Sequence, residues 1–182
     1  VQVLKRFYGL VVIDEAYIDF TKSKSFIHEL KKYPNLVVLQ TFSKAWGLAG
    51  LRLGMCFASE EIIGILNKIK YPYNVNGHTQ ELALDALENI YRKDIWVHEI
   101  LKEKEILVHE LEALDLVDKV FPSDANFLLV RVRDAQSTYQ YLMDNRIIVR
   151  DRSRVNLCYN CLRITVGTPE ENKRLIDALK KL

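Results

Sequence analysis

Long apolar stretches are missing from this sequence of 182 residues, and so is any cluster of basic residues interleaved with aromatic ones. No apolar run approaches the roughly 20 residues that a helix needs to cross a bilayer. The charges nearly balance, with 26 Lys and Arg against 24 Asp and Glu, and they form no basic stripe typical of a nucleic-acid surface. We therefore expect neither a membrane nor a nucleic acid among the partners. Apolar residues make up 49% of the chain, which is typical of a soluble globular protein.

Cysteine and histidine are also scarce. The three cysteines are an odd number without the spacing of a disulfide framework, and the four histidines show no partner for a Ser-His-Asp arrangement. Cys158 and Cys161 form one C-x-x-C, but a zinc site needs a second pair of ligands nearby, so a redox pair is the alternative that stays open. We expect reduced thiols and no metal site. Because the first residues also lack a signal-peptide pattern, we expect a cytoplasmic location.

The most informative stretch covers residues 36–54 and reads LVVLQTFSKAWGLAGLRLG. Its first four residues have the composition of a buried parallel strand. Ser43 and Lys44 follow that strand, and Arg52 comes eight residues after the lysine. A lysine amine can condense with a carbonyl group, while an arginine and a serine hydroxyl can bind a phosphate. The pattern favours a cofactor that carries both groups, although any single Lys or Arg is more often a solvated surface residue.

A second apolar run, residues 10–13, is followed by Asp14 and Tyr17. Open α/β sheets bind ligands at the carboxyl ends of their strands, so Asp14 and Lys44 would share one edge of the sheet if their strands are neighbours. A carboxylate that faces a pyridine nitrogen keeps the ring protonated and makes it a better electron sink. The Tyr17 hydroxyl can donate a hydrogen bond to a phenolic oxygen on such a ring.

These motifs together resemble a known family. D-E-A-Y followed by S-K-A-W-G-L-A-G-L-R-L-G, with Asp14 and Lys44 at positions 30 apart, resembles the fold-type I pyridoxal-phosphate aminotransferases. Further on, I-I-V-R-D and C-L-R-I-T-V-G-T-P-E-E, with Arg150 and Arg163 at positions 13 apart, look like the histidinol-phosphate aminotransferase subfamily. The resemblance runs over the whole chain and implies pyridoxal 5'-phosphate as cofactor, with Lys44 as the catalytic residue. The cofactor-binding residues that it implies are Asp14, Tyr17, Ser43, Lys44 and Arg52.

The same resemblance assigns substrate binding to two arginines. Arg163 would clamp the α-carboxylate of the amino acid, and Arg150 would bind the phosphate of the substrate. Position alone favours plainer interpretations, namely an edge-exposed or acid-paired Arg163 and a local ion pair between Arg150 and Asp151. The implied reaction exchanges the amino group between L-histidinol phosphate and 2-oxoglutarate, and the full-length members are homodimers. Two alternatives stay open: another member of the superfamily, such as a threonine-phosphate decarboxylase or an aromatic aminotransferase, and a folded but catalytically inert domain.

The resemblance also implies an α/β fold that is the C-terminal part of a fold-type I pyridoxal-phosphate transferase. Residues 1–75 would end the large, mostly parallel-sheet domain, and residues 76–182 would form bridging helices and a small α/β domain. About half of the protein, with several cofactor contacts, would precede residue 1. The residue patterns predict strands at 10–13, 36–40, 53–58, 127–132, 147–149 and 162–166, and helices at 26–32, from 59, at 79–91, 94–114 and 135–144, and from 169.

Overall fold

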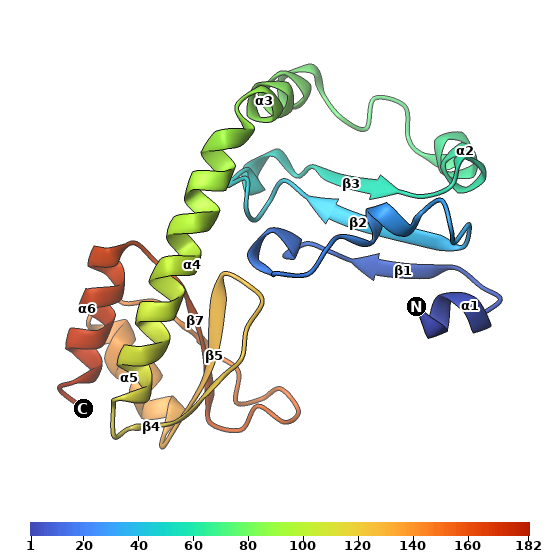
Figure 1. The fold of residues 1–182 in the computed structure, drawn as a ribbon. Helices are drawn as coiled ribbons and strands as arrows, with labels where there is room; N and C mark the ends of the chain where they lie inside the picture. Colours follow the sequence, from blue (N-terminus) through green and yellow to red (C-terminus); the bar gives the residue numbers. More distant parts are fainter. The chain divides into compact units, whose positions relative to one another are not determined.

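The computed structural model describes all residues from 1 to 182 and divides into two compact units, residues 1–94 and 95–182. Each unit has its own sheet and its own buried core (Figure 1). The boundary falls within the longest helix, α4 (Ile90–Glu112). The division after residue 75 that the family resemblance implies stays a prediction about the domains of the parent protein.

Unit 1 is built on a three-stranded sheet with the order β1-β2-β3. β1 (Val11–Asp14) runs parallel to β2 (Leu36–Thr41), and β3 (Gly54–Phe57) runs antiparallel to β2. Leu36 and Val38 are fully buried, because one face of β2 carries the apolar core of this unit. Since β3 is antiparallel, its amino end lies at the same edge of the sheet as the carboxyl ends of β1 and β2. This edge carries the residues predicted to bind a cofactor.

The helical segments of unit 1 differ from the predictions at two places. The helix expected at 26–32 is a single 3-10 turn, η2 (Phe26–Glu29), capped by the Ser25 hydroxyl and held by bonds between residues three apart. The helix expected to reach residue 91 ends earlier, at Glu88, where Asn89 caps it: its backbone N–H and its side-chain amide both donate to the Asp85 carbonyl. The remaining segments are α1 (Gln2–Arg6), η1 (Ile18–Phe20), η3 (Ala49–Leu51), α2 (Glu60–Ile69) and α3 (Gly77–Glu88).

Unit 2 contains an antiparallel sheet of four strands in the order β4-β5-β7-β6. The strand predicted at 127–132 is confirmed as β5, and that at 162–166 is shifted by one residue in β7. The strand predicted at 147–149 is wrong, because the Ile147 N–H still bonds the Leu142 carbonyl of the preceding helix and pairing begins only afterwards. The sequence did not predict β4, because two adjacent charged residues interrupt the alternation of apolar and polar residues that is typical of a strand. The strands are β4 (Val117–Phe121), β5 (Phe127–Val132), β6 (Arg150–Asp151) and β7 (Cys161–Thr165).

The core of unit 2 lies between one face of this sheet and three helices, α4, α5 (Ala135–Asp144) and α6 (Pro169–Leu179) (Figure 1). α6 begins as predicted at Pro169, after a capping box between Thr168 and Glu171. Alternate residues of the strands point into the core, and the residues between them form the opposite face of the sheet. None of the helices combines the length and the apolarity needed to cross a bilayer. The buried core residues include Leu107, Leu111, Leu128, Val130, Leu162, Ile164 and Ile176.

Candidate active site

The first candidate site lies at the edge of the unit 1 sheet where β1 and β2 end and β3 begins. β1 and β2 are parallel neighbours, so Asp14 at the end of β1 and the segment after β2 share this edge. The pairing of β2 with β3 continues beyond the strands, because the Phe42 N–H donates to the Leu53 carbonyl at 3.2 Å. Ser43 and Arg52 are the next residues on either side of this bond. The structure therefore gathers the predicted carboxylate, hydroxyl and guanidinium at one edge.

Lys44 follows at the same edge, in a turn closed by a hydrogen bond of 2.9 Å from the Gly47 N–H to the Lys44 carbonyl. Gly47 has a φ of +68°, which glycine adopts without strain. The Lys44 ammonium lies 5.2 Å from the centroid of the Tyr17 ring. The Lys44 side chain is exposed, and no carboxylate forms an ion pair with it. The aromatic ring is therefore the partner that its ammonium group contacts. Tyr17 and Lys44, predicted from different motifs, are thus brought together.

The other polar groups at this edge make only local hydrogen bonds. The Arg52 guanidinium is exposed and donates to the Ala49 carbonyl at 3.0 Å, and its backbone is left-handed, with φ 53°. The Ser43 N–H donates to the Thr41 hydroxyl at 3.0 Å. One oxygen of Asp14 accepts the backbone N–H two residues further on, at 2.9 Å. None of these side chains is engaged in an ion pair, so each can still bind a ligand.

Lys93 supports this site from α4. Its ammonium lies 2.8 Å from a carboxylate oxygen of Asp19 and 3.0 Å from one of Asp94. It also lies 5.3 Å from the centroid of the Trp46 ring. Asp19 belongs to the segment after β1 and Trp46 to the segment after β2, so one lysine ties together the two loops that carry the predicted cofactor residues. Sequence reasoning missed this residue, because nothing nearby in the sequence marks it.

The ion pairs of Lys93 predict a loss of stability at alkaline pH. Partial burial lowers the pKa of Lys93, but the hydrogen bonds with Asp19 and Asp94 outweigh that effect, and the pKa is raised above 10.5. A lysine whose pKa is higher in the folded than in the unfolded chain stabilises the fold. This stabilisation is complete below the unfolded pKa and is lost as the pH rises through the folded pKa. Lys93→Met should therefore melt at a lower temperature than the parent at about pH 8, with the difference shrinking as the pH rises through the raised pKa. Lys68→Met, an exposed lysine of α2, is the control, and a difference independent of pH would contradict the assignment.

Glu15 is a second residue that sequence reasoning passed over. It follows Asp14 but is buried, and its carboxylate accepts three hydrogen bonds. The donors are the Ser25 hydroxyl at 2.6 Å, the Phe26 N–H at 2.7 Å and the Gln40 amide at 3.0 Å. These bonds tie the turn after β1 to η2 and to β2. Glu15 thus fixes the turn whose other residues face the site.

Truncating this carboxylate is expected to destabilise unit 1. Glu15→Ala leaves three buried or half-buried donors without their acceptor, which should cost about 2–4 kcal/mol of unfolding free energy. Chemical denaturation followed by circular dichroism measures the loss. Glu29→Ala is the matched control, since its exposed pair with Lys32 should contribute less than about 1 kcal/mol. Equal losses for the two variants would show that Glu15 has no special structural role.

The second candidate site is on the sheet of unit 2, where the register of β6 and β7 places Arg150 directly opposite Arg163. Residues directly opposite in an antiparallel pair project from the same face, and like charges in that position repel. Neither arginine forms an ion pair. The local pair between Arg150 and Asp151 that position alone favours is absent, because Asp151 instead accepts the Ser153 N–H at 2.8 Å. Two uncompensated guanidinium groups are thus held side by side.

Arg163 is held by an aromatic ring. β7 lies between β5 and β6, so Arg163 is half-buried on a central strand and is neither at an edge nor paired with an acid. Its guanidinium lies 5.0 Å from the centroid of the Phe127 ring, which orients the planar group without neutralising it. Its Nε is buried and has no hydrogen-bond partner. A buried N–H without an acceptor is costly, and an anionic ligand would supply one.

The fold and both clusters agree with one class of enzyme. A sequence model of the family described as "Aminotransferase class I and II" matches residues 1–179, and the chain belongs to this family. Over 179 residues, or 98% of this chain, it is 56% identical to the histidinol-phosphate aminotransferase of Cytophaga hutchinsonii. The match covers 51% of that relative, so the chain spans about half the length of the curated relatives it matches.

Solved structures agree with this assignment. The histidinol-phosphate aminotransferase of Clostridium acetobutylicum superposes with a TM-score of 0.91 at 26% identity, covering 99% of this chain and 57% of that one. The histidinol-phosphate aminotransferase of Sinorhizobium meliloti, solved in complex with pyridoxal-5'-phosphate, gives 0.81 at 25% identity, over 94% of this chain and 48% of that one. The predicted α/β fold and the resemblance to a C-terminal portion of such an enzyme are thereby confirmed. The roles of individual site residues stay predictions.

Proposed function

We propose that the protein to which this chain belongs exchanges an amino group between L-histidinol phosphate and 2-oxoglutarate, using pyridoxal 5'-phosphate. The observation that carries the proposal is the edge of the unit 1 sheet, where Lys44 lies over the Tyr17 ring and where β1 ends with Asp14, β2 is followed by Ser43 and β3 is preceded by Arg52. The close relatives named for this activity support it. We also propose the cytoplasm as its location and a homodimer as its assembly, on the family resemblance alone.

The groups at this edge fit the cofactor by their chemistry. Lys44 offers an amine that no acid neutralises, and Arg52 and Ser43 offer a fork of donors and a hydroxyl for a phosphate dianion. Asp14 offers a carboxylate for the protonated ring nitrogen, and Tyr17 offers a hydroxyl for the phenolic oxygen. When bound, pyridoxal phosphate supplies an electron sink that stabilises negative charge on the carbon bearing the amino group.

Lys44 carries the proton transfer in this proposal. Its amine would hold the cofactor through the carbonyl group. The free Lys44 amine would take the proton from the substrate Cα as a general base and give a proton back as a general acid. Asp14 would face the ring nitrogen and favour its protonated form. This division of roles explains why a carboxylate and an amine are needed at the same edge.

Unit 2 supplies two anion-binding groups for the substrates. Arg163 would bind a carboxylate by two parallel hydrogen bonds, which fixes the orientation of the amino acid as well as its position. Arg150 would bind the phosphate. Two guanidinium groups on one face suit a pair of substrates of which one carries a phosphate and the other carboxylates.

The test is turnover by a protein that supplies the half of the relatives' length that this chain does not cover. We expect amino transfer from histidinol phosphate to 2-oxoglutarate, and slower reaction with threonine phosphate or aromatic amino acids. Preferred decarboxylation of threonine phosphate, or preferred transfer from an aromatic amino acid, would replace the proposal by another member of the superfamily. The 182-residue chain by itself is expected to be inactive, because it spans only about half the length of the relatives named for this activity.

A further inference from the structure

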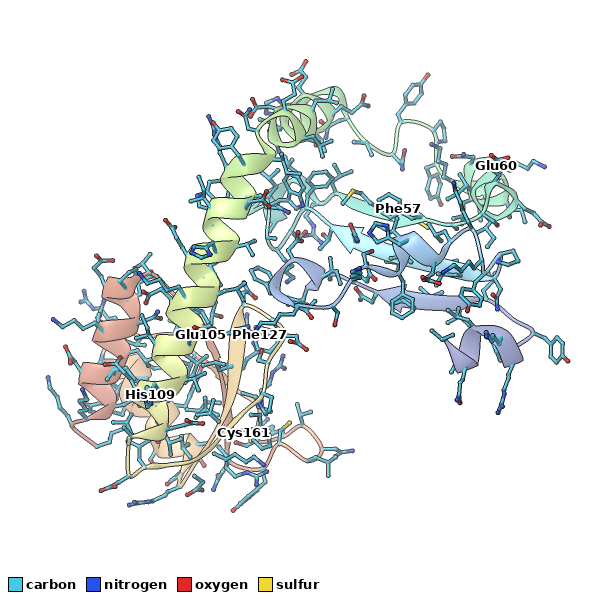
Figure 2. All side chains as sticks on the ribbon, in the orientation of Figure 1. Phe57, Glu60, Glu105, His109, Phe127 and Cys161 are labelled. Atoms are coloured by element: carbon cyan, nitrogen blue, oxygen red, sulfur yellow. The ribbon has the colours of Figure 1, made fainter.

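The face of the unit 2 sheet that points away from its helices carries more positive charge than the two predicted substrate arginines. Arg131 on β5 is paired with Cys161 on β7, and Leu129 is paired with Arg163, so Arg131 and Arg163 are diagonal neighbours on this face. Phe127 and Cys161, labelled in Figure 2, mark the two strands. Diagonal neighbours are about 7–8 Å apart, within reach of long side chains. Arg131, Arg150 and Arg163 thus form a cationic cluster on two rungs of one sheet.

Arg131 is built into the sheet in the same way as Arg163. Its guanidinium lies 5.3 Å from the centroid of the Phe121 ring on the neighbouring strand. The Nε of Arg131, like the Nε of Arg163, is buried and has no hydrogen-bond partner. Its one side-chain hydrogen bond, to the Leu157 carbonyl, is 3.5 Å long and at the limit of such a bond. No carboxylate pairs with it. The Arg131 guanidinium is thus half-buried, oriented by a ring and not neutralised by an acid. A bound anion would supply both the missing hydrogen-bond acceptor and the missing negative charge.

We infer that Arg131 is a third anion-binding group of this face and that it selects a phosphate monoester over a carboxylate. A carboxylate is planar, carries one charge and is fully occupied by one guanidinium fork. A phosphate dianion has a second charge and three terminal oxygens that point in different directions, so a diagonal guanidinium finds an acceptor that a carboxylate lacks. The inference deepens the proposed function, on which its biological meaning rests, by giving Arg131 the discrimination between the two substrates.

The test uses inorganic phosphate and acetate as probes of the 182-residue chain, with binding followed by NMR at the Nε–Hε signals of Arg131 and Arg163. Phosphate should move both signals, whereas acetate should move that of Arg163 alone. Arg131→Gln should weaken phosphate binding to the three-arginine cluster about tenfold and leave acetate binding at Arg163 within about twofold. Lys102→Gln, an exposed lysine on α4, removes the same charge from the helical side of the unit and should change neither.

Three results would overturn the inference. In the first, Arg131→Gln binds phosphate as tightly as the parent does, and only the amide signals near Leu157 move. Arg131 would then only support the segment after β6. In the second, the variant weakens the binding of phosphate and of acetate equally, and Arg131 would then contribute only its net charge. If the glutamine variant does not fold, Arg131→Lys keeps the charge without the fork and should still lose about threefold in phosphate affinity, so an unchanged affinity overturns the inference too.

The proposed function is tested by different measurements. Arg163→Gln tests the carboxylate clamp through acetate binding, and attachment of the cofactor tests Lys44. Either can succeed or fail whatever Arg131 does to phosphate. The two claims are therefore separable in one set of variants.

Discussion

Replacing Lys44 with alanine is expected to lower the rate of amino transfer in the full-length protein by about 10²–10⁴-fold or more. In the proposed mechanism Lys44 supplies both the amine that attaches the cofactor and the base that moves the Cα proton, and the variant lacks both. Ser43 and Arg52, the groups proposed to bind the phosphate, are unchanged. We therefore expect the cofactor to bind without covalent attachment, and chemistry to fall far more than cofactor affinity.

The attachment can be measured without turnover. Pyridoxal phosphate is added, the mixture is reduced with borohydride, and the modified lysine is located by mass spectrometry. The parent should carry the label on Lys44, and Lys68→Ala should be labelled as the parent is. Absorbance and labelling of equal strength in Lys44→Ala and in the parent would remove Lys44 from the mechanism.

Replacing Arg163 with glutamine is expected to have two effects of opposite sign. Loss of the fork should weaken binding of the amino-acid carboxylate by about 2–5 kcal/mol, or roughly 30-fold or more. Loss of one charge from the directly opposed pair with Arg150 should stabilise the chain without ligand by about 0.2–1 kcal/mol. A residue that is there only for packing would lose stability when truncated, so the two signs together identify a ligand-binding role.

Two measurements on the same variants separate these effects. The KM for glutamate is measured in the full-length protein, and the unfolding free energy is measured without ligand. Arg163→Lys keeps the charge but not the fork, so it should lose affinity without gaining stability. Lys173→Gln on α6 is the charge-matched control and should change neither quantity. A destabilised Arg163→Gln with an unchanged KM would contradict the substrate role.

The second prediction describes side chains that the fold holds against its own stability, because Arg150 faces another arginine across a strand pair. Lys44, in contrast, is exposed over a ring and has no acidic partner. Opposite charges or hydrogen-bond partners are missing at the arginine pair and present elsewhere, as at Lys93 and at Glu15. Such conflicts are concentrated at functional sites, where the missing partner is a ligand.

The sequence by itself determined the parts that depend on local chemistry. The apolar runs at 36–39 and 127–132 can be satisfied only by buried or half-buried strands, and they form β2 and β5. Ser59 and Pro169 mark helix starts through capping groups that act within one turn. The same local motifs indicated the class of enzyme, which the family match over residues 1–179 confirms.

Only the tertiary structure decided which of these groups meet. The direction of β3, which brings Arg52 to the same edge as Ser43, depends on pairing between strands. The register that sets Arg163 between Arg150 and the Phe127 ring depends on it too. The contact of Lys93 with Asp19 joins residues far apart in the sequence. Local patterns act over one or two turns of chain, whereas register and long-range ion pairs are chosen by the packing of the whole unit.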